Sequence, residues 1–194
     1  MHERVINKQK AVLFVNGDDL EEAKIIRKAM LGDAQALEQL IGRYYDRIFA
    51  FCCRRLGDSS VGADACQTTF LKLVQYLPRY REKGYFKSWL FMIASNCCND
   101  LFRKKRDMVE LSEEIKDSRA EFENKMENAE LLKKALEQLP MEQKEVVILR
   151  YYHDFSTNDV ARVQHVPPAT VKTRLHRGLK KLKKVLGEEI LLET

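Results

Sequence analysis

Apolar residues recur every three or four positions along most of this chain, the spacing of an α-helix that buries one face. The clearest example covers residues 36–56, and the same period continues over residues 61–77 and 89–106. The first stripe consists of Leu37, Leu40, Ile41, Tyr44, Ile48, Phe51 and Cys52. The next two consist of Cys66, Phe70, Leu73 and Leu77, and of Leu90, Ile93, Ala94, Cys97 and Leu101. The pattern predicts a bundle of amphipathic helices in the first half of the chain.

Turn-forming residues separate these predicted helices. Residues 57–60 read Gly-Asp-Ser-Ser, which indicates a turn followed by a helix cap. Pro78 is expected to end the second helix, because proline breaks the hydrogen-bond ladder. Residues 79–87 contain a glycine and no helical period, so a loop is expected there, and Ser88 is the expected cap of the third helix.

A second group of helical patterns follows an acidic stretch that is typical of a linker. The patterns cover residues 129–139, 141–153, 157–163 and 168–186, with very short connections. The chain is therefore predicted to be all-α, with two small helical domains joined by a flexible acidic linker. The expected boundaries are an N-terminal arm at 1–18, a first domain at 19–107, the linker at 108–128 and a second domain at 129–190.

The second domain contains the pattern of a helix-turn-helix, in which a short helix and a tight turn precede a longer basic helix. The second helix of this motif enters the major groove of DNA, where side chains that reach base edges and phosphates are needed. The candidates are Thr170, Lys172, Thr173, Arg174, His176 and Arg177. A basic helix is also often only a solvated surface, and the helix-turn-helix spacing is what favours DNA binding here.

Composition narrows the function further. The net charge of +5 favours a polyanionic partner only weakly, and no apolar run is long enough to cross a membrane. We therefore expect a cytoplasmic protein without membrane insertion. Five cysteines without metal-ligand spacing are expected to be reduced and buried, and four scattered histidines form no catalytic cluster. Neither an enzyme nor a cofactor is indicated.

Several segments resemble one family of transcription proteins. Residues 139–151 and 170–178 closely resemble region 4 of bacterial sigma factors, the promoter-recognition subunits of RNA polymerase. Residues 64–73 resemble their region 2.2, and residues 86–96 resemble regions 2.3 and 2.4. The extracytoplasmic-function (ECF) subgroup of the sigma-70 family is the best match, because a linker of this length leaves no room for the middle domain of larger sigma factors.

The resemblance implies a function and a set of partners. The first domain would bind core RNA polymerase and melt the promoter around −10, and the second would read the −35 element during transcription initiation. The implied protein partners are the β′ clamp helices and the β flap of core polymerase, with an anti-sigma factor as a further expectation. The alternative is a stand-alone helix-turn-helix regulator, which would usually dimerise and bind a palindrome.

The predicted polymerase contact lies on the helix at 61–77. Asp64, Gln67 and Leu71 are spaced to share one face away from the apolar stripe, with an apolar centre and polar flanks that suit a protein partner. Together with Thr68, they occupy the region that resembles the clamp-binding segment of the family. A merely solvated face is the alternative, since single exposed leucines are common.

The predicted −10 contact lies at the start of the next helix and in the loop before it. Aromatic rings beside basic residues suit single-stranded DNA, whose bases stack on rings while its phosphates pair with cations. The candidates are Tyr85, Phe86, Lys87, Trp89, Asn96 and Arg103. Asn96 matches the family position that lines a pocket for a flipped base, whereas Trp89 is equally consistent with a core tryptophan.

Several positions depart from the family pattern. His165 stands where the family usually has glycine, in a turn that tends to need a positive φ, and Gln164 replaces a usual apolar residue. Pro167-Pro168 stands where a Ser or Thr cap is common in the family, so the last helix is expected to begin there with its capping coming from elsewhere. Met92 replaces a frequent arginine, which removes one expected phosphate contact.

Overall fold

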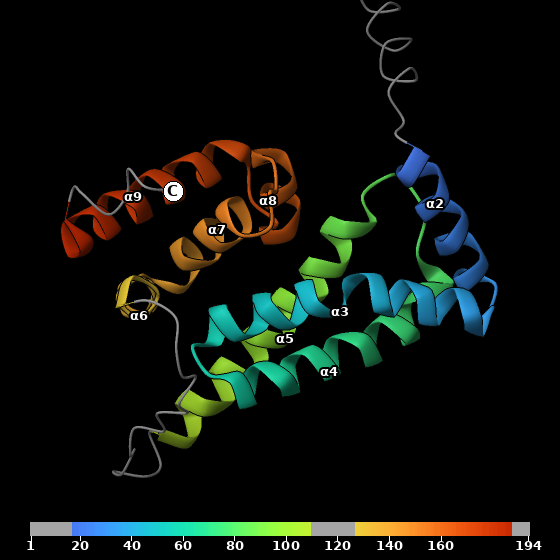
Figure 1. The fold of residues 1–194 in the computed structure, drawn as a ribbon, viewed down its shortest axis with the longest axis horizontal. Coiled ribbons are helices and arrows are strands. Elements are labelled where there is room, and N and C mark those ends of the chain that lie inside the picture. The colour runs from blue at the N-terminus through green and yellow to red at the C-terminus, as the bar shows by residue number, and fades with distance from the viewer. Residues whose placement is uncertain (1–16, 110–126, 188–194) are drawn as a thin grey trace, which may run out of the picture.

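The computed structural model describes residues 17–109 and 127–187 of the chain. In this part the fold is all-α, as predicted, and its helices form two groups (Figure 1). The first group comprises α2 (Gly17–Met30), α3 (Ala34–Leu56), α4 (Ser59–Tyr76), the 3-10 turn η1 (Leu77–Arg79) and α5 (Phe86–Val109). The second comprises α6 (Glu127–Glu137), α7 (Met141–Tyr151), α8 (Thr157–Gln164) and α9 (Pro168–Leu186). Most of the predicted linker and arm lie outside the described residues.

Short polar side chains set where the long helices begin. The carboxylate of Asp33 accepts a hydrogen bond from the Ala36 N–H at 2.9 Å, and that of Asp58 accepts one from Val61 N–H at 3.0 Å. Between α3 and α4, Gly57 adopts φ 77° and ends α3 in the left-handed conformation that glycine tolerates best. The predicted turn at 57–60 is thus confirmed, and α3 and α4 pack side by side.

The expected cap of α5 is wrong. The helix begins at Phe86, and its first turn already closes with a 3.0 Å hydrogen bond from Trp89 N–H to Tyr85 C=O. Ser88 therefore lies inside the helix, where its hydroxyl donates to Asp159 of the second group at 3.3 Å. Pro78 does end the preceding α-helix, although one 3-10 turn, η1, continues the chain past it.

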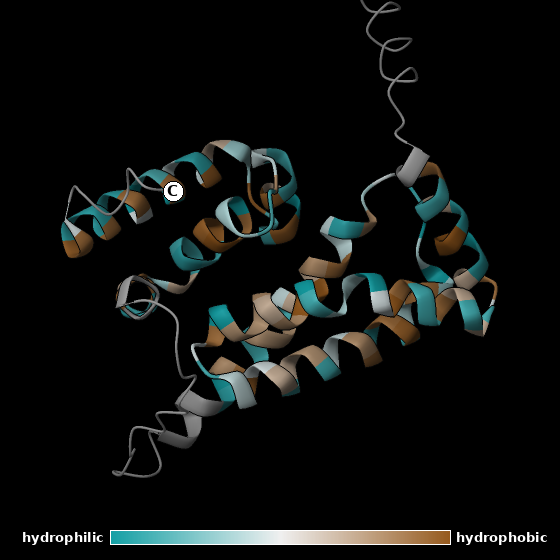
Figure 2. Ribbon diagram, in the orientation of Figure 1, coloured by the Kyte–Doolittle hydropathy of each residue, from teal (hydrophilic) through white to brown (hydrophobic). Residues whose placement is uncertain are grey.

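The core of the first group is built from the predicted stripes. Leu40, Ile48 and Phe51 of α3 are buried, as are Leu73 of α4 and Leu90 of α5. Figure 2 shows hydrophobic segments of α3, α4 and α5 where these helices run together. Four of the five cysteines are also buried, which agrees with the prediction that they are small core residues.

The second group has a smaller core and packs against the first. Its α6, α7 and α9 enclose a core cluster of Ala135, Leu136, Leu139, Val147 and Leu182. A larger cluster is shared by both groups, since Phe155 and Val160 join Phe91 of α5 in it. The helices that meet across the boundary are α5 with α8 and α3 with α7. The sequence pattern did not predict this contact.

No helix in the described parts of the chain is long and apolar enough to cross a membrane.

A tight contact between α3 and α4 occurs at Gly62, near the start of α4. A Cβ added at Gly62 would lie 2.6 Å from the Cys53 Sγ and 2.8 Å from its Cα. Gly62→Ala should therefore destabilise the protein by about 1–3 kcal/mol, because the helices must move apart. Thermal unfolding measures this. The control, Gly42→Ala, meets no other element within 4 Å and should stabilise α3 by about 0.5–1 kcal/mol. Equal melting temperatures for the two variants would contradict the tight crossing.

Candidate nucleic-acid and polymerase interfaces

The helix-turn-helix is formed by α8 and α9. Ser156 caps α8 in a reciprocal capping box with Asp159, which satisfies two backbone N–H groups at the start of this short helix. At the other end, His165 adopts φ 52° and ψ 44°, so the turn has the positive φ expected at this position without the usual glycine. No side chain caps α9, which begins with Pro168 as the sequence predicts.

Gln164 ties the motif to its supporting helix. Its amide nitrogen donates to the Glu145 carboxylate at 3.0 Å and to the Glu142 C=O at 3.1 Å, both on α7. Its amide oxygen accepts from Arg174 of α9 at 2.9 Å. The polar residue that replaces the family's usual apolar one therefore links α7, α8 and α9. As a result, the Arg174 guanidinium has an intramolecular partner and is half-buried.

One face of α9 is basic and open to solvent, whereas the other packs on α7. Val171, Gly178 and Leu182 are buried, and Gly178 lies so close that an added Cβ would be 3.2 Å from a Val147 methyl group. Of the six predicted −35 residues, four are exposed and two are half-buried. The exposed ones are Lys172, Thr173, His176 and Arg177, and the half-buried ones are Thr170 and Arg174. The solvent-facing side of α9 therefore carries the cations Lys172 and Arg177.

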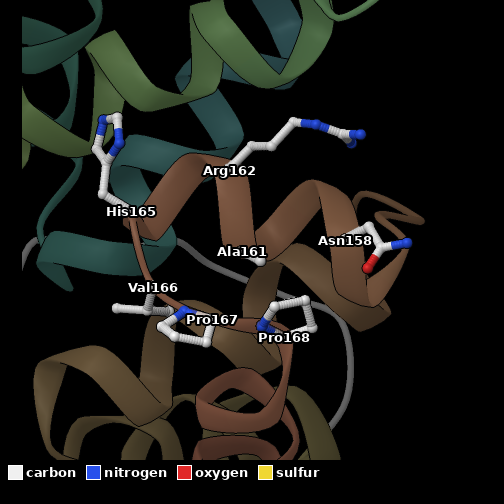
Figure 3. Close-up of a pocket in the computed structure, with 7 residues that line it drawn as sticks. All are labelled: Asn158, Ala161, Arg162, His165, Val166, Pro167 and Pro168. Carbon is white, nitrogen blue, oxygen red and sulfur yellow. The ribbon is translucent and has the colours of Figure 1, made fainter.

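A shallow hollow lies beside the turn of the motif. Figure 3 shows Pro167 and Pro168 on one side of it and Asn158 and Arg162 of α8 on the other. In the same view the side chains of His165 and Arg162 point toward α5. The turn thus contacts the first group of helices rather than standing free.

The predicted polymerase-binding face lies on the outside of α4. Asp64, Gln67 and Leu71 are exposed, and Thr68 is half-buried. Leu71 leaves 60% of its surface open. Val74, one helical turn further, is 46% exposed, and sequence reasoning missed it although its spacing from Leu71 is three.

The predicted −10 residues do not all lie on one open surface. Tyr80, Phe86 and Trp89 form a ring cluster, with centroids 4.4 Å apart for Tyr80 and Trp89 and 5.6 Å apart for Phe86 and Trp89. Phe86 is only 3% exposed and also meets Tyr44 edge-on at 5.5 Å. Direct stacking of the Phe86 ring on a base therefore disagrees with the structure, because the ring is part of the core that supports Trp89.

The remaining −10 candidates separate into two places. Asn96 and Arg103 are exposed along α5, with Arg103 paired to Asp100 at 2.9 Å. Lys87, in contrast, donates a 2.8 Å hydrogen bond to the His153 C=O, and Arg162 lies 3.8 Å above the Tyr85 ring. Burial lowers the pKa of Lys87, with the nearby Arg47 acting in the same direction. Two predicted DNA contacts are therefore engaged by the second group of helices.

Within the described residues, no group of three or more His, Cys, Asp or Glu side chains is placed to hold a metal ion.

The domain families identify the chain. Residues 40–107 match the family described as Sigma-70 region 2, and residues 129–182 match Sigma-70, region 4, which together cover more than half of the sequence. An all-helical fold with a helix-turn-helix in its second half is what these two regions define. The chain belongs to the sigma-70 family, in its extracytoplasmic-function subgroup. Its function is that of an RNA polymerase sigma factor, which directs promoter-specific transcription initiation.

Individual relatives agree with this assignment. The ECF RNA polymerase sigma factor SigW of Bacillus subtilis is 26% identical over 180 residues, which cover 85% of this chain and 96% of that protein. The RNA polymerase sigma factor CarQ of Myxococcus xanthus is 29% identical over 161 residues, covering 81% and 92%. Among solved structures, the sigma factor RpoE from its Bartonella quintana complex with the anti-sigma factor NepR shares the fold. It has a TM-score of 0.67 at 24% identity and covers 78% of this chain and 97% of that one.

Proposed function

We propose that this sigma factor docks on core RNA polymerase through the exposed face of α4 and contacts a promoter with α5 at −10 and α9 at −35. In this proposal the polymerase-binding and −10 domain covers residues 19–107, and the −35 domain covers residues 129–190. The observation that carries it is the segregation of α9, whose buried side packs on α7 while Lys172, His176 and Arg177 face solvent. The alternative of a stand-alone regulator loses its support with the family assignment.

Each promoter contact has a physical role in the proposal. Arg177 and Lys172 meet guanine edges or phosphates in the major groove, since guanidinium and ammonium groups are donors to those acceptors. Asn96 hydrogen-bonds to an unstacked base, because an amide offers both a donor and an acceptor. Trp89, whose ring lies 4.4 Å from that of Tyr80 at an interplanar angle of 35°, supplies a rigid wall beside that base, and Arg103 supplies a positive charge for the DNA backbone.

The proposal also includes the setting in which the protein works. It acts in the cytoplasm as one copy per polymerase, on the β′ clamp helices and the β flap, and it is not an enzyme. The similar RpoE was solved in complex with an anti-sigma factor. An anti-sigma factor that holds this chain away from polymerase is part of the same proposal.

The polymerase contact can be tested separately from DNA. Leu71→Glu should weaken binding to core RNA polymerase by about tenfold or more, because a carboxylate replaces the apolar centre of the contact. The free energy of unfolding should change little, since the Leu71 side chain is already 60% exposed. Fluorescence anisotropy of labelled protein titrated with core polymerase measures the affinity.

The matched control for that measurement is Leu31→Glu. Leu31 is 89% exposed at the end of α2 and lies outside the proposed contact, so this variant should bind core polymerase like the parent protein. Equal losses in both variants would assign the effect to added charge. Unchanged binding by Leu71→Glu would remove α4 from the proposed contact.

A further inference from the structure

The side chain of Gln164 joins three helices at the turn of the helix-turn-helix. Its amide nitrogen donates to the Glu145 carboxylate at 3.0 Å and to the Glu142 C=O at 3.1 Å, both on α7. Its amide oxygen accepts from Nη1 of Arg174 on α9 at 2.9 Å. The nitrogen thus faces two acceptors and the oxygen faces a cation. A flipped amide would place its N–H groups against the guanidinium, so these partners fix the orientation of the amide.

The α7 side of this link is fixed. The Glu142 carbonyl belongs to the helical backbone of α7. Glu145 is buried, and its carboxylate also pairs with the Arg55 guanidinium of α3 at 3.2 Å, with side chains 4% and 2% exposed. A helical carbonyl and a buried, paired carboxylate have little freedom to move. Gln164 is therefore held on the α7 side by two well-placed acceptors.

Arg174 lies at the edge of the packed side of α9. Val171 and Gly178 are buried there, where α9 packs on α7. At about 100° per helical residue, Arg174 is turned about 60° from Val171, whereas Arg177 is turned about 120° from it. Arg174 is accordingly half-buried, and Arg177 is exposed. The Arg174 guanidinium ends on Gln164, at the side of the helix that faces α7.

The turn between α8 and α9 needs such a link. His165, which follows Gln164, adopts φ 52° and ψ 44°, a left-handed conformation that is unfavourable for residues other than glycine. Pro167 and Pro168, drawn in Figure 3, have no N–H that could tie the turn to α8. The side-chain bonds of Gln164 therefore supply a connection between α8 and α9 that these two residues cannot supply.

We propose that Gln164 is a positioning residue for −35 recognition. By holding the Arg174 guanidinium, it sets the angle at which α9 presents Lys172 and Arg177 to the major groove. Arg174 acts through the placement of α9 and does not read a base. The inference rests on the proposed function, which gives α9 its place in the −35 contact.

The two possible roles of Arg174 differ in their effect on base preference. A guanidinium that reads guanine forms two hydrogen bonds to one base, so its loss relaxes the preference at that one position. A guanidinium that positions α9 supports every contact of the helix. Its loss therefore reduces the preference at all positions of the −35 element together.

The test is a double-mutant cycle in the full-length protein bound to core RNA polymerase. Gln164→Leu removes the amide at similar size, and Arg174→Leu removes the guanidinium while the bonds from Gln164 to α7 remain. The holoenzymes select from a pool of double-stranded DNA fragments of random sequence, and sequencing of the bound fragments gives the preference at each position. The fragment that the parent enriches most then serves as the probe for the affinity of each variant. Circular dichroism on heating measures whether each variant is folded at the assay temperature.

Two further variants complete the design. Arg174→Lys is the conservative one, because an ammonium can still donate to the Gln164 oxygen, and it should retain the parent's affinity within about twofold. The same change would alter the preference at a guanine that Arg174 read through two bonds, since lysine cannot replace that fork. Gln138→Leu removes an exposed amide just before α7, outside the link, and should bind like the parent.

Gln164→Leu and Arg174→Leu should each weaken binding to the selected fragment by about fivefold to tenfold, because each loses a hydrogen bond that involves a charged group. The double variant should bind no more weakly than either single variant, since both changes remove the same link. Additive losses, or a preference lost at one base only in Arg174→Leu, would overturn the inference. Unchanged binding by folded Gln164→Leu would also overturn it. A parent holoenzyme that selects no sequence around −35 would overturn the proposed function itself.

Discussion

Replacing Asn96 with alanine is expected to reduce run-off transcription from a dependent promoter by about tenfold to a hundredfold. The reason is that lost hydrogen bonds to a base cost about 1–3 kcal/mol, and about 1.4 kcal/mol corresponds to a factor of ten. The amide is exposed on α5, between the buried Ala94 and Cys97, so nothing in the described core depends on it. Alanine is also the better helix former, and the helix should remain intact. The transcript yield at saturating protein measures the effect.

The control for this variant is Gln39→Ala. It removes an exposed amide from α3, outside the proposed DNA and polymerase contacts, and should leave the yield unchanged. Permanganate reactivity of unpaired thymines around −10 adds a second readout, because loss of a base pocket should reduce melting while polymerase binding persists. Full melting by the Asn96→Ala holoenzyme would show that the amide does not hold a flipped base.

Replacing Arg177 with alanine is expected to weaken binding to the −35 element by about 1–3 kcal/mol and to relax base preference at one position. The guanidinium lies on the solvent side of α9, opposite the residues that pack on α7. It can therefore approach a base edge without rearrangement, unlike Arg174, which is bound to Gln164. Electrophoretic mobility shifts with a set of single-base variants of the element measure both quantities.

Lys184→Ala provides the comparison for Arg177→Ala. Lys184 is an exposed cation in the last turn of the same helix. Its loss should weaken binding to all sequences alike and reduce the salt dependence by about one released counterion. If Arg177→Ala also weakened all sequences alike, its role would be limited to phosphate contact.

The local structure of this protein follows closely from its sequence. The bounds predicted for α9, residues 168–186, agree with the structure because Pro168 and Gly187 punctuate the helix at both ends. The predicted start of α5 was wrong because a serine can cap a helix or sit inside one, and only its partner, here Asp159, distinguishes the two. Phe86 likewise looked like an exposed ring beside a loop, but Tyr44, Tyr80 and Trp89 enclose it.

The contact between the two groups of helices could not be predicted in the same way. Arg55 follows Phe51 and Cys52 at helical spacing, so the sequence indicated that its side chain lies on the buried face of α3. The partner of Arg55, however, depends on how distant segments pack together. Glu145 is ninety positions away along the chain, in α7. The apolar residues of α7 also fit packing within the second group of helices, so they give no sign of a contact with α3. The spacing of apolar residues identifies which face of a helix is buried, but it does not identify the helix that packs against that face.

Run-off transcription with purified core RNA polymerase, with and without this protein, on a pool of promoter fragments tests the central claim most directly. The account predicts discrete transcripts that depend on the protein and that share sequence around −10 and −35. Sequence-specific DNA binding without any stimulation of core polymerase would contradict it.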